Sequence, residues 1–202
     1  MQVHQSAANP VRGLRPVTPA LLRAEELAGR WRGLPLTGSK AQLLQLLEDV
    51  TAEAMKVSNG ARRLAHWYVK KQPKACFRRV DQVNVTTLDR QGLSLISTYS
   101  DAYVAAALDV TSRTLARWRA ELASAGWSAF RDAPDRSRFR LGSPDNPDDA
   151  YGVDLRPIIV RYEELQALAQ DRFDGIKHLL ALRRDLSRRR LRLRGLMALF
   201  SE

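Results

Sequence analysis

The chain has 202 residues, of which 33 are lysine or arginine and 22 are aspartate or glutamate, so its formal charge at pH 7 is +11. A hydrophobic fraction of 45% suffices for a packed core and excludes a chain that is disordered by composition. The excess of positive charge favours a nucleic acid as partner, and the sequence lacks the apolar run of about 20 residues that would favour a membrane.

The cysteine count and the polar start of the chain limit the kinds of site and the compartment. The single cysteine, Cys76, can form neither an internal disulfide nor a cysteine-cluster zinc site. Residues 1–10 lack the apolar stretch of a secretory signal. We therefore expect a cytoplasmic protein.

The first half of the chain is predicted to be a polar arm followed by a helical lobe. Residues 1–19 carry three prolines and a glycine and are expected to form a disordered arm. Residues 20–98 are predicted to form an N-terminal helical or winged-helix-like lobe. Apolar periodicity predicts its helices over residues 20–32, 39–56 and 61–71, and residues 72–98 fit either short strands or an irregular connection.

Residues 100–125 have the pattern of two helices joined by a short turn. Helices are predicted over 100–108 and 112–125, and Gly126 is well placed to end the second. Thr111 can cap the second helix, which carries basic and small polar residues at its start. This pattern indicates a helix-turn-helix.

The residues that follow are predicted to form a β-hairpin wing. Residues 127–131 and 138–141 alternate as strands do, around turn-forming residues at 133–137, and arginines line one edge. The helix-turn-helix and this wing would together make a domain over residues 99–142. The predicted fold is thus mainly α-helical with a small β-hairpin wing, either one winged helix-turn-helix or two tandem winged-helix-like lobes.

The last part of the sequence is predicted to be a linker and a helical extension. Residues 143–150 are acidic and proline-bearing, as in a linker, and 151–202 would form the extension. Its helices are expected over 157–169 and 176–200. The second is strongly basic, and its leucine spacing does not hold a strict heptad, so no coiled coil is predicted. We expect a solvated face whose leucines pack or mediate self-association, with a nonspecific contribution to DNA binding.

The candidate functional residues are those that could contact double-stranded DNA. Side chains near the start of a recognition helix reach base edges, where arginine pairs with guanine, while hydroxyls and backbone N–H groups hold phosphates. Wing arginines would follow the backbone or enter the minor groove. The candidates are Ser100, Thr111, Ser112, Arg113, Thr114, Arg117, Arg131, Arg136, Arg138 and Arg140. The competing interpretation is a helix pair that is packed for structure alone.

Four motifs in the second half of the chain carry a family resemblance. They are Thr114-Leu115-Ala116-Arg117, Ala125-Gly126-Trp127, Arg131-Asp132-Ala133-Pro134 and Tyr151-Gly152-Val153-Asp154-Leu155-Arg156-Pro157. In order and spacing they resemble the RepC replication initiators of repABC-type plasmids, over roughly residues 17–190. Ala116 departs from the family pattern by replacing a basic residue, and Arg119 by standing where an apolar residue is usual.

The resemblance implies sequence-specific binding of double-stranded DNA at a plasmid origin, initiation of replication, and recruitment of host replication proteins. The alternatives are a winged-helix transcriptional regulator and a truncated initiator-derived DNA-binding protein. A nuclease or other enzyme would need a phosphate loop, a metal-ligand pair or a nucleophile with a base, and the sequence offers none of these. We expect no catalytic residues, no metal and no other cofactor.

Overall fold

The computed structural model describes residues 18–35, 38–77, 95–131, 138, 140–143 and 146–199. Within them the fold is mainly helical with a small antiparallel sheet, which is compatible with the predicted winged-helix-like class. The helices are α1 (Pro19–Gly29), α2 (Lys40–Asp49), α3 (Asn59–Lys71), the 3-10 helix η1 (Lys74–Phe77), α5 (Asp101–Leu108), α6 (Ser112–Ser124), α7 (Arg156–Val160) and α8 (Tyr162–Leu199). The strands are β1 (Ile96–Ser97), β2 (Ala129–Arg131), β3 (Arg140–Ser143), β4 (Asn146–Ala150) and β5 (Gly152–Asp154).

Side-chain caps explain where the helices of the body begin. In each case a hydroxyl accepts a hydrogen bond from the backbone N–H three residues later, which satisfies one of the free donors of the first turn. The capping residues are Thr18, Ser39, Ser58, Ser100 and Thr111. The helix predicted over 39–56 is shorter than expected, because Val50 is extended and Thr51 caps a separate turn by accepting from the N–H of Ala54.

The predicted helix-turn-helix is confirmed in its elements. Asp109 ends α5 in the left-handed region, at φ 55°, and Thr111 then starts α6. Gly126 has φ +73°, and the N–H of Trp127 donates to the Leu122 carbonyl at 2.8 Å. Glycine adopts this conformation without the cost that a Cβ adds, so the chain can leave α6 sharply and enter β2.

One hydrophobic core runs across the boundary that the sequence suggested at residue 98. Leu64 and Tyr68 of α3 lie in the same buried cluster as Leu115 of α6, Trp127 and Ile158 of α7. α3 and α6 approach each other closely, because a Cβ on Gly60 would lie 2.0 Å from ring carbons of Trp118. The N-terminal helices and the helix-turn-helix are therefore packed as a single unit.

The strand pairing differs from the predicted hairpin. β2 pairs antiparallel with β5, and β5 pairs on its other side with β1, which gives the order β1-β5-β2. β3 pairs instead with β4 in a separate ribbon, so residues 146–150, expected to be part of a linker, form a strand. Alternation along a strand predicts its faces but not its partner, and the buried sequence of β5 makes it the central strand.

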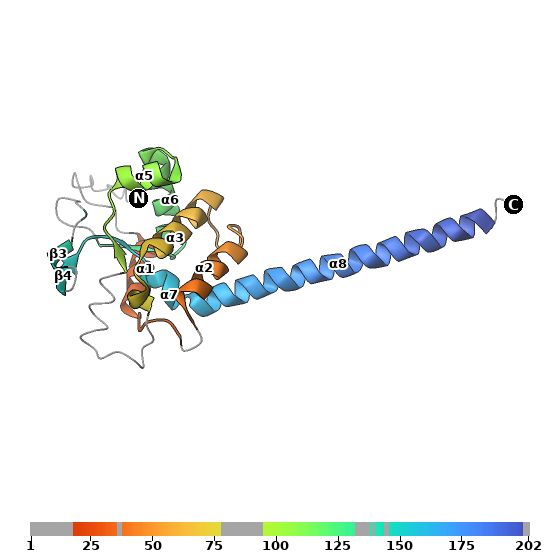
Figure 1. Ribbon diagram of the computed structural model, residues 1–202, viewed down its shortest axis with the longest axis horizontal. Coiled ribbons are helices and arrows are strands. Elements are labelled where there is room, and N and C mark those ends of the chain that lie inside the picture. Colours follow the sequence, from red (N-terminus) through yellow and green to blue (C-terminus); the bar gives the residue numbers. More distant parts are fainter. Residues whose placement is uncertain are drawn as a thin grey trace, which may run out of the picture.

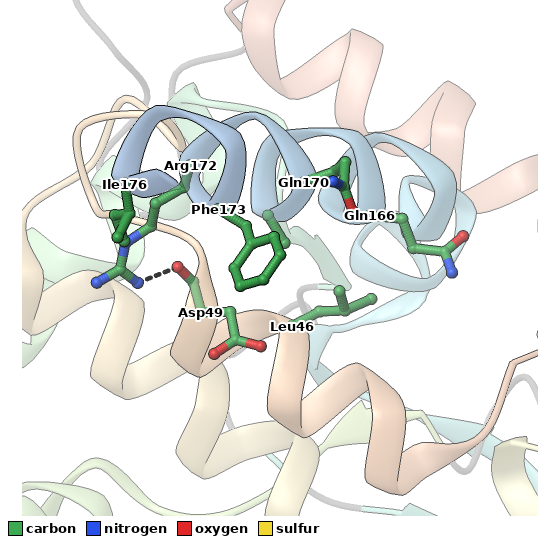
Figure 2. A pocket seen from close by; sticks show the side chains of 8 residues that line it. Leu46, Asp49, Gln166, Gln170, Arg172, Phe173 and Ile176 are labelled. Carbon is green, nitrogen blue, oxygen red and sulfur yellow. Dashed lines mark hydrogen bonds between the residues drawn. The ribbon is translucent and has the colours of Figure 1, made fainter. Parts of the chain in front are cut away.

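The two C-terminal helices differ in length from the prediction. α7 is short, and α8 runs for 38 residues without the expected break between 169 and 176. Figure 1 shows α8 leaving the body as a long rod, on the side opposite the β3–β4 ribbon. Where it leaves, Arg172 donates to the Asp49 carbonyl at the end of α2, and Figure 2 shows the Phe173 ring turned toward α2 and Leu46. Within the described residues, no helix is long and apolar enough to cross a membrane.

The contact between Gly60 and Trp118 gives the first prediction. We expect Gly60→Ala to lower the free energy of unfolding by about 1–3 kcal/mol, because the methyl group overlaps the indole and forces α3 away from α6. Urea denaturation followed by circular dichroism measures the change. The control is Gly29→Ala in α1, where a Cβ meets no atom within 4 Å. A Gly60→Ala protein as stable as this control would contradict the packing.

Candidate nucleic-acid interface

Helix α6 has one buried side and one exposed side. Its buried residues, which face α1, α3 and α5, are Leu115, Trp118, Arg119, Leu122 and Ala123. The exposed residues, which we call the open face of α6, are Ser112, Arg113, Ala116, Arg117, Ala120 and Ser124. The helix is thus held rigidly from behind, and a ligand can reach it along its length.

The open face combines positive charge with small side chains. Arg113 and Arg117 are one helical turn apart and therefore project from the same side. Ala116 and Ala120 lie beside them and leave the backbone of α6 accessible at close range. The unpaired N–H groups and the positive dipole end of the first turn favour anions nearby. This arrangement suits the edges and phosphates of a duplex.

Glu121 lies between Arg117 and the start of α3. Its carboxylate accepts hydrogen bonds from Ser58 at the start of α3, at 3.1 Å from the N–H and 2.5 Å from Oγ. The other carboxylate oxygen lies 3.7 Å from Nε of Arg117, whose side chain is 69% exposed. An exposed pair of this kind contributes little energy. Glu121 therefore orients Arg117 while leaving its side chain accessible to a ligand.

Two of the hydroxyl residues predicted to contact DNA, Ser100 and Thr111, cap the starts of helices. Thr111 accepts from the N–H of Thr114 at 3.2 Å, and their two hydroxyls lie 3.0 Å apart. Ser100 accepts from the N–H of Tyr103 at 3.3 Å. Ser112 lies exposed in the first turn of α6. Any contact of these residues with DNA stays a prediction.

The arginines predicted to lie on the wing do not share one exposed edge in the described residues. Arg131 lies on β2, half-buried, with its guanidinium 6.0 Å from the centre of the Tyr151 ring. Arg138 is turned inward, at 17% exposure, and bonds to Asp101. Arg140 begins β3, and its side chain lies outside the described residues, as does all of Arg136. The structure thus groups Ser112, Arg113 and Arg117 on the open face of α6, whereas Thr114 is half-buried and Arg138 is turned inward.

Sequence reasoning missed the ionic cluster around Asp101. Arg119 is almost fully buried in α6, and its guanidinium lies 2.7 Å from the Asp101 carboxylate, which Arg138 also contacts. Tyr68 lies against the same group, and burial raises its pKa to about 12, so its hydroxyl stays protonated. Arg119 stands where the RepC family usually has an apolar residue, and this departure is the one feature of the sequence that could have indicated the cluster. A buried cation there requires a counter-ion.

A second cluster joins the end of α6 to the start of α8. Arg161 stacks on the Trp127 ring, 3.4 Å from its centre, and donates to the Ala125 carbonyl at 2.7 Å. It also makes two hydrogen bonds of 2.6 Å to the Glu164 carboxylate. These bonds lower the pKa of Glu164 below its usual value. The direction in which α8 leaves the body is therefore tied to the end of α6.

The comparisons with known proteins are consistent with this architecture. The family model described as "Replication protein C N-terminal domain" matches residues 15–200. No curated protein and no solved structure matches the chain. The matched range includes the helix-turn-helix, both sets of strands and all of α8.

The Asp101 cluster gives a second prediction. We expect Asp101→Asn to lower the free energy of unfolding by about 2 kcal/mol, because the change keeps the shape but removes the counter-charge of buried Arg119. Asp109→Asn, at an exposed left-handed position that asparagine tolerates, is the matched control. Combining Asp101→Asn with Arg119→Met should restore part of the loss. Equal stability of the two single variants in urea denaturation would contradict this role for Asp101.

A third prediction concerns pH. Folding lowers the pKa of Glu164 below its ordinary value of 4.5. The ionised carboxylate therefore contributes fully to the free energy of unfolding above pH 4.5, and this contribution disappears as the pH falls through the lowered pKa. Glu164→Gln should therefore cost up to about 1 kcal/mol at neutral pH, and the difference from the unmodified protein should vanish in acid. Denaturation curves across this range measure it, with exposed Glu163→Gln as control. A difference that persists unchanged in acid would contradict the ion pair.

Proposed function

The chain belongs to the Replication protein C N-terminal domain family, and from this membership we propose that it binds double-stranded DNA sequence-specifically at a plasmid origin. The family implies a role in starting replication. The observation that carries the DNA-binding part is the open face of α6. That face presents two exposed arginines on a helix whose opposite side is fixed in the core.

The proposed complex places α6 in the major groove. The groove is wide enough for one α-helix, and residues near the helix start reach base edges. Arg113 and Arg117 would contact guanine or phosphate oxygens, while Ala116 and Ala120 allow close approach and can pack on thymine methyl groups. Backbone N–H groups at Ser112 and beyond would hold a phosphate. The buried Arg119 takes no part in this contact, because Asp101 neutralises it.

The β3–β4 ribbon is proposed as the wing. It projects from the body away from α8, as Figure 1 shows, and Arg140 begins its first strand. A two-stranded ribbon beside a recognition helix can follow the phosphate backbone or enter the minor groove. Arg136 and Arg140 remain the candidates for this contact. Host replication proteins as partners, and a cytoplasmic location, are proposed on the strength of the family alone.

Arg117 is the residue on which we would test base recognition. After selection of bound sequences from random duplexes, Arg117→Ala should weaken binding to the preferred site by about 5-fold to 150-fold and relax the preference near one base pair. Fluorescence anisotropy at fixed salt measures the affinity. Arg30→Ala, at the C-cap of α1, is the control: this exposed arginine is paired with Glu26, and the variant should bind as the unmodified protein does.

The salt dependence assigns Arg117 to base or phosphate. If it contacts a phosphate, the variant loses affinity equally for all sequences and the slope of log affinity against log salt falls by about 0.9. Footprinting on the plasmid origin and on promoter fragments separates an initiator from a regulator. Unchanged affinity when both Arg113 and Arg117 are replaced by alanine would overturn the proposed interface.

A further inference from the structure

Helix α8 exposes a series of large apolar side chains along most of its length. From Asp171 to Met197, nearly every side chain of α8 is exposed. The exposed apolar residues from this stretch, between 44% and 73% exposed, are Phe173, Ile176, Leu179, Leu180, Leu182, Leu186, Leu191, Leu193, Leu196 and Met197. A bare helix of this composition loses the burial that normally stabilises helices in proteins.

Five of the leucines form one stripe along the rod. Leu179, Leu182, Leu186, Leu193 and Leu196 follow alternating steps of three and four, with one position of the series taken by Arg189. This is the spacing of the a and d positions of a coiled coil. Leu180 and Leu191 fall outside the series, and their presence interrupts the heptad pattern when all the leucines of α8 are considered. We call the five residues the leucine seam.

We propose that a second copy of this chain covers the leucine seam, with the two α8 helices antiparallel. Knobs-into-holes packing then sets Leu179 against the partner's Leu196, and Leu182 against the partner's Leu193. The two-fold axis passes between residues 187 and 188, so the seam is complementary to itself, as a symmetric dimer requires. Ile176 and the partner's Met197 meet on one flank and extend the apolar contact at both ends.

The arginine within the seam favours the antiparallel arrangement. Asp185 holds Arg189 within its own helix, with 2.8 Å between Oδ2 and Nε. Parallel helices would stack Arg189 on the partner's Arg189 in one layer, whereas antiparallel helices set it against the partner's Leu186. On the other flank, Asp185 then faces the partner's Arg192. Arg183 faces the partner's Arg190 on the opposite flank, so each half of the dimer has one attractive and one repulsive flank pair, and Arg189 decides the direction.

The net charge of the rod predicts how the dimer responds to salt. Residues 171–199 contain nine basic and three acidic residues, a net charge of +6. Two such helices repel each other at low ionic strength, and salt screens that repulsion. Association through the apolar seam should therefore strengthen as salt rises, whereas DNA binding weakens. The two activities can be separated in one salt titration, so the dimer does not depend on the proposed function.

Sedimentation equilibrium of the full chain without DNA tests the proposal. The protein should pass from monomer to dimer with rising concentration, more readily at high salt. Leu182→Gln with Leu193→Gln should weaken the dimer by at least about 100-fold, since four buried leucines are lost per dimer. The matched control, Leu180→Gln with Leu191→Gln, changes leucines of similar exposure outside the seam and should dimerise as the unmodified chain does. Glutamine keeps the helix propensity near that of leucine.

Cysteine cross-linking tests the direction of the pair. The native Cys76 is buried and should not compete. A mixture of Leu179→Cys and Leu196→Cys chains should form a mixed disulfide dimer, while each variant alone stays uncross-linked. Self-cross-linking of each variant would show a parallel pair and overturn the proposed arrangement. A chain that stays monomeric at all salt concentrations, or whose seam variants lose only binding to anionic vesicles, would overturn the dimer itself.

Discussion

The contact of Trp118 with Gly60 fixes the distance between α3 and α6, and the presentation of the open face of α6 depends on it. The absence of a Cβ at Gly60 lets the indole lie against the backbone of α3. Glu121 reinforces the same junction by bonding to Ser58, the residue that caps α3. With its rear side fixed in this way, α6 can expose arginines and alanines on its open face without losing its position.

The arginines of this chain serve two purposes that burial separates. Arg119 and Arg138 are drawn inward by one carboxylate, that of Asp101, and tie α5, α6 and the segment before β3 together. Arg113 and Arg117 are exposed on the other side of α6. A charge count of the region cannot make this distinction, because all four residues contribute equally to it. Only the exposed pair adds to a field that a phosphate backbone experiences at short range.

Local signals in the sequence predicted the helices well and the strand pairing poorly. Serine and threonine caps, apolar periodicity and Gly126 act over three or four residues, so α5, the turn and α6 follow from sequence alone. β2 could pair with β3 or with β5, and the alternation of side chains does not indicate which of these distant segments is its partner. The orientation of Arg138 depends on this strand pairing, so the residues next to Arg138 in the sequence do not predict it. The seam of α8 was hidden because exposed leucines outside the heptad break its pattern.

The link between α6 and α8 gives the proposed dimer a consequence for DNA. Arg161 holds the carbonyl of Ala125 and the ring of Trp127, so the recognition helix and the start of α8 move as one body. In the antiparallel pair the two starts of α8 lie about 75 Å apart, at 1.5 Å per residue. Two turns of duplex span about 70 Å. A dimer joined through a rod of this length therefore cannot place its two α6 helices in adjacent turns, as compact helix-turn-helix dimers do. It fits sites that are repeated at a wider spacing, or two separate segments of DNA.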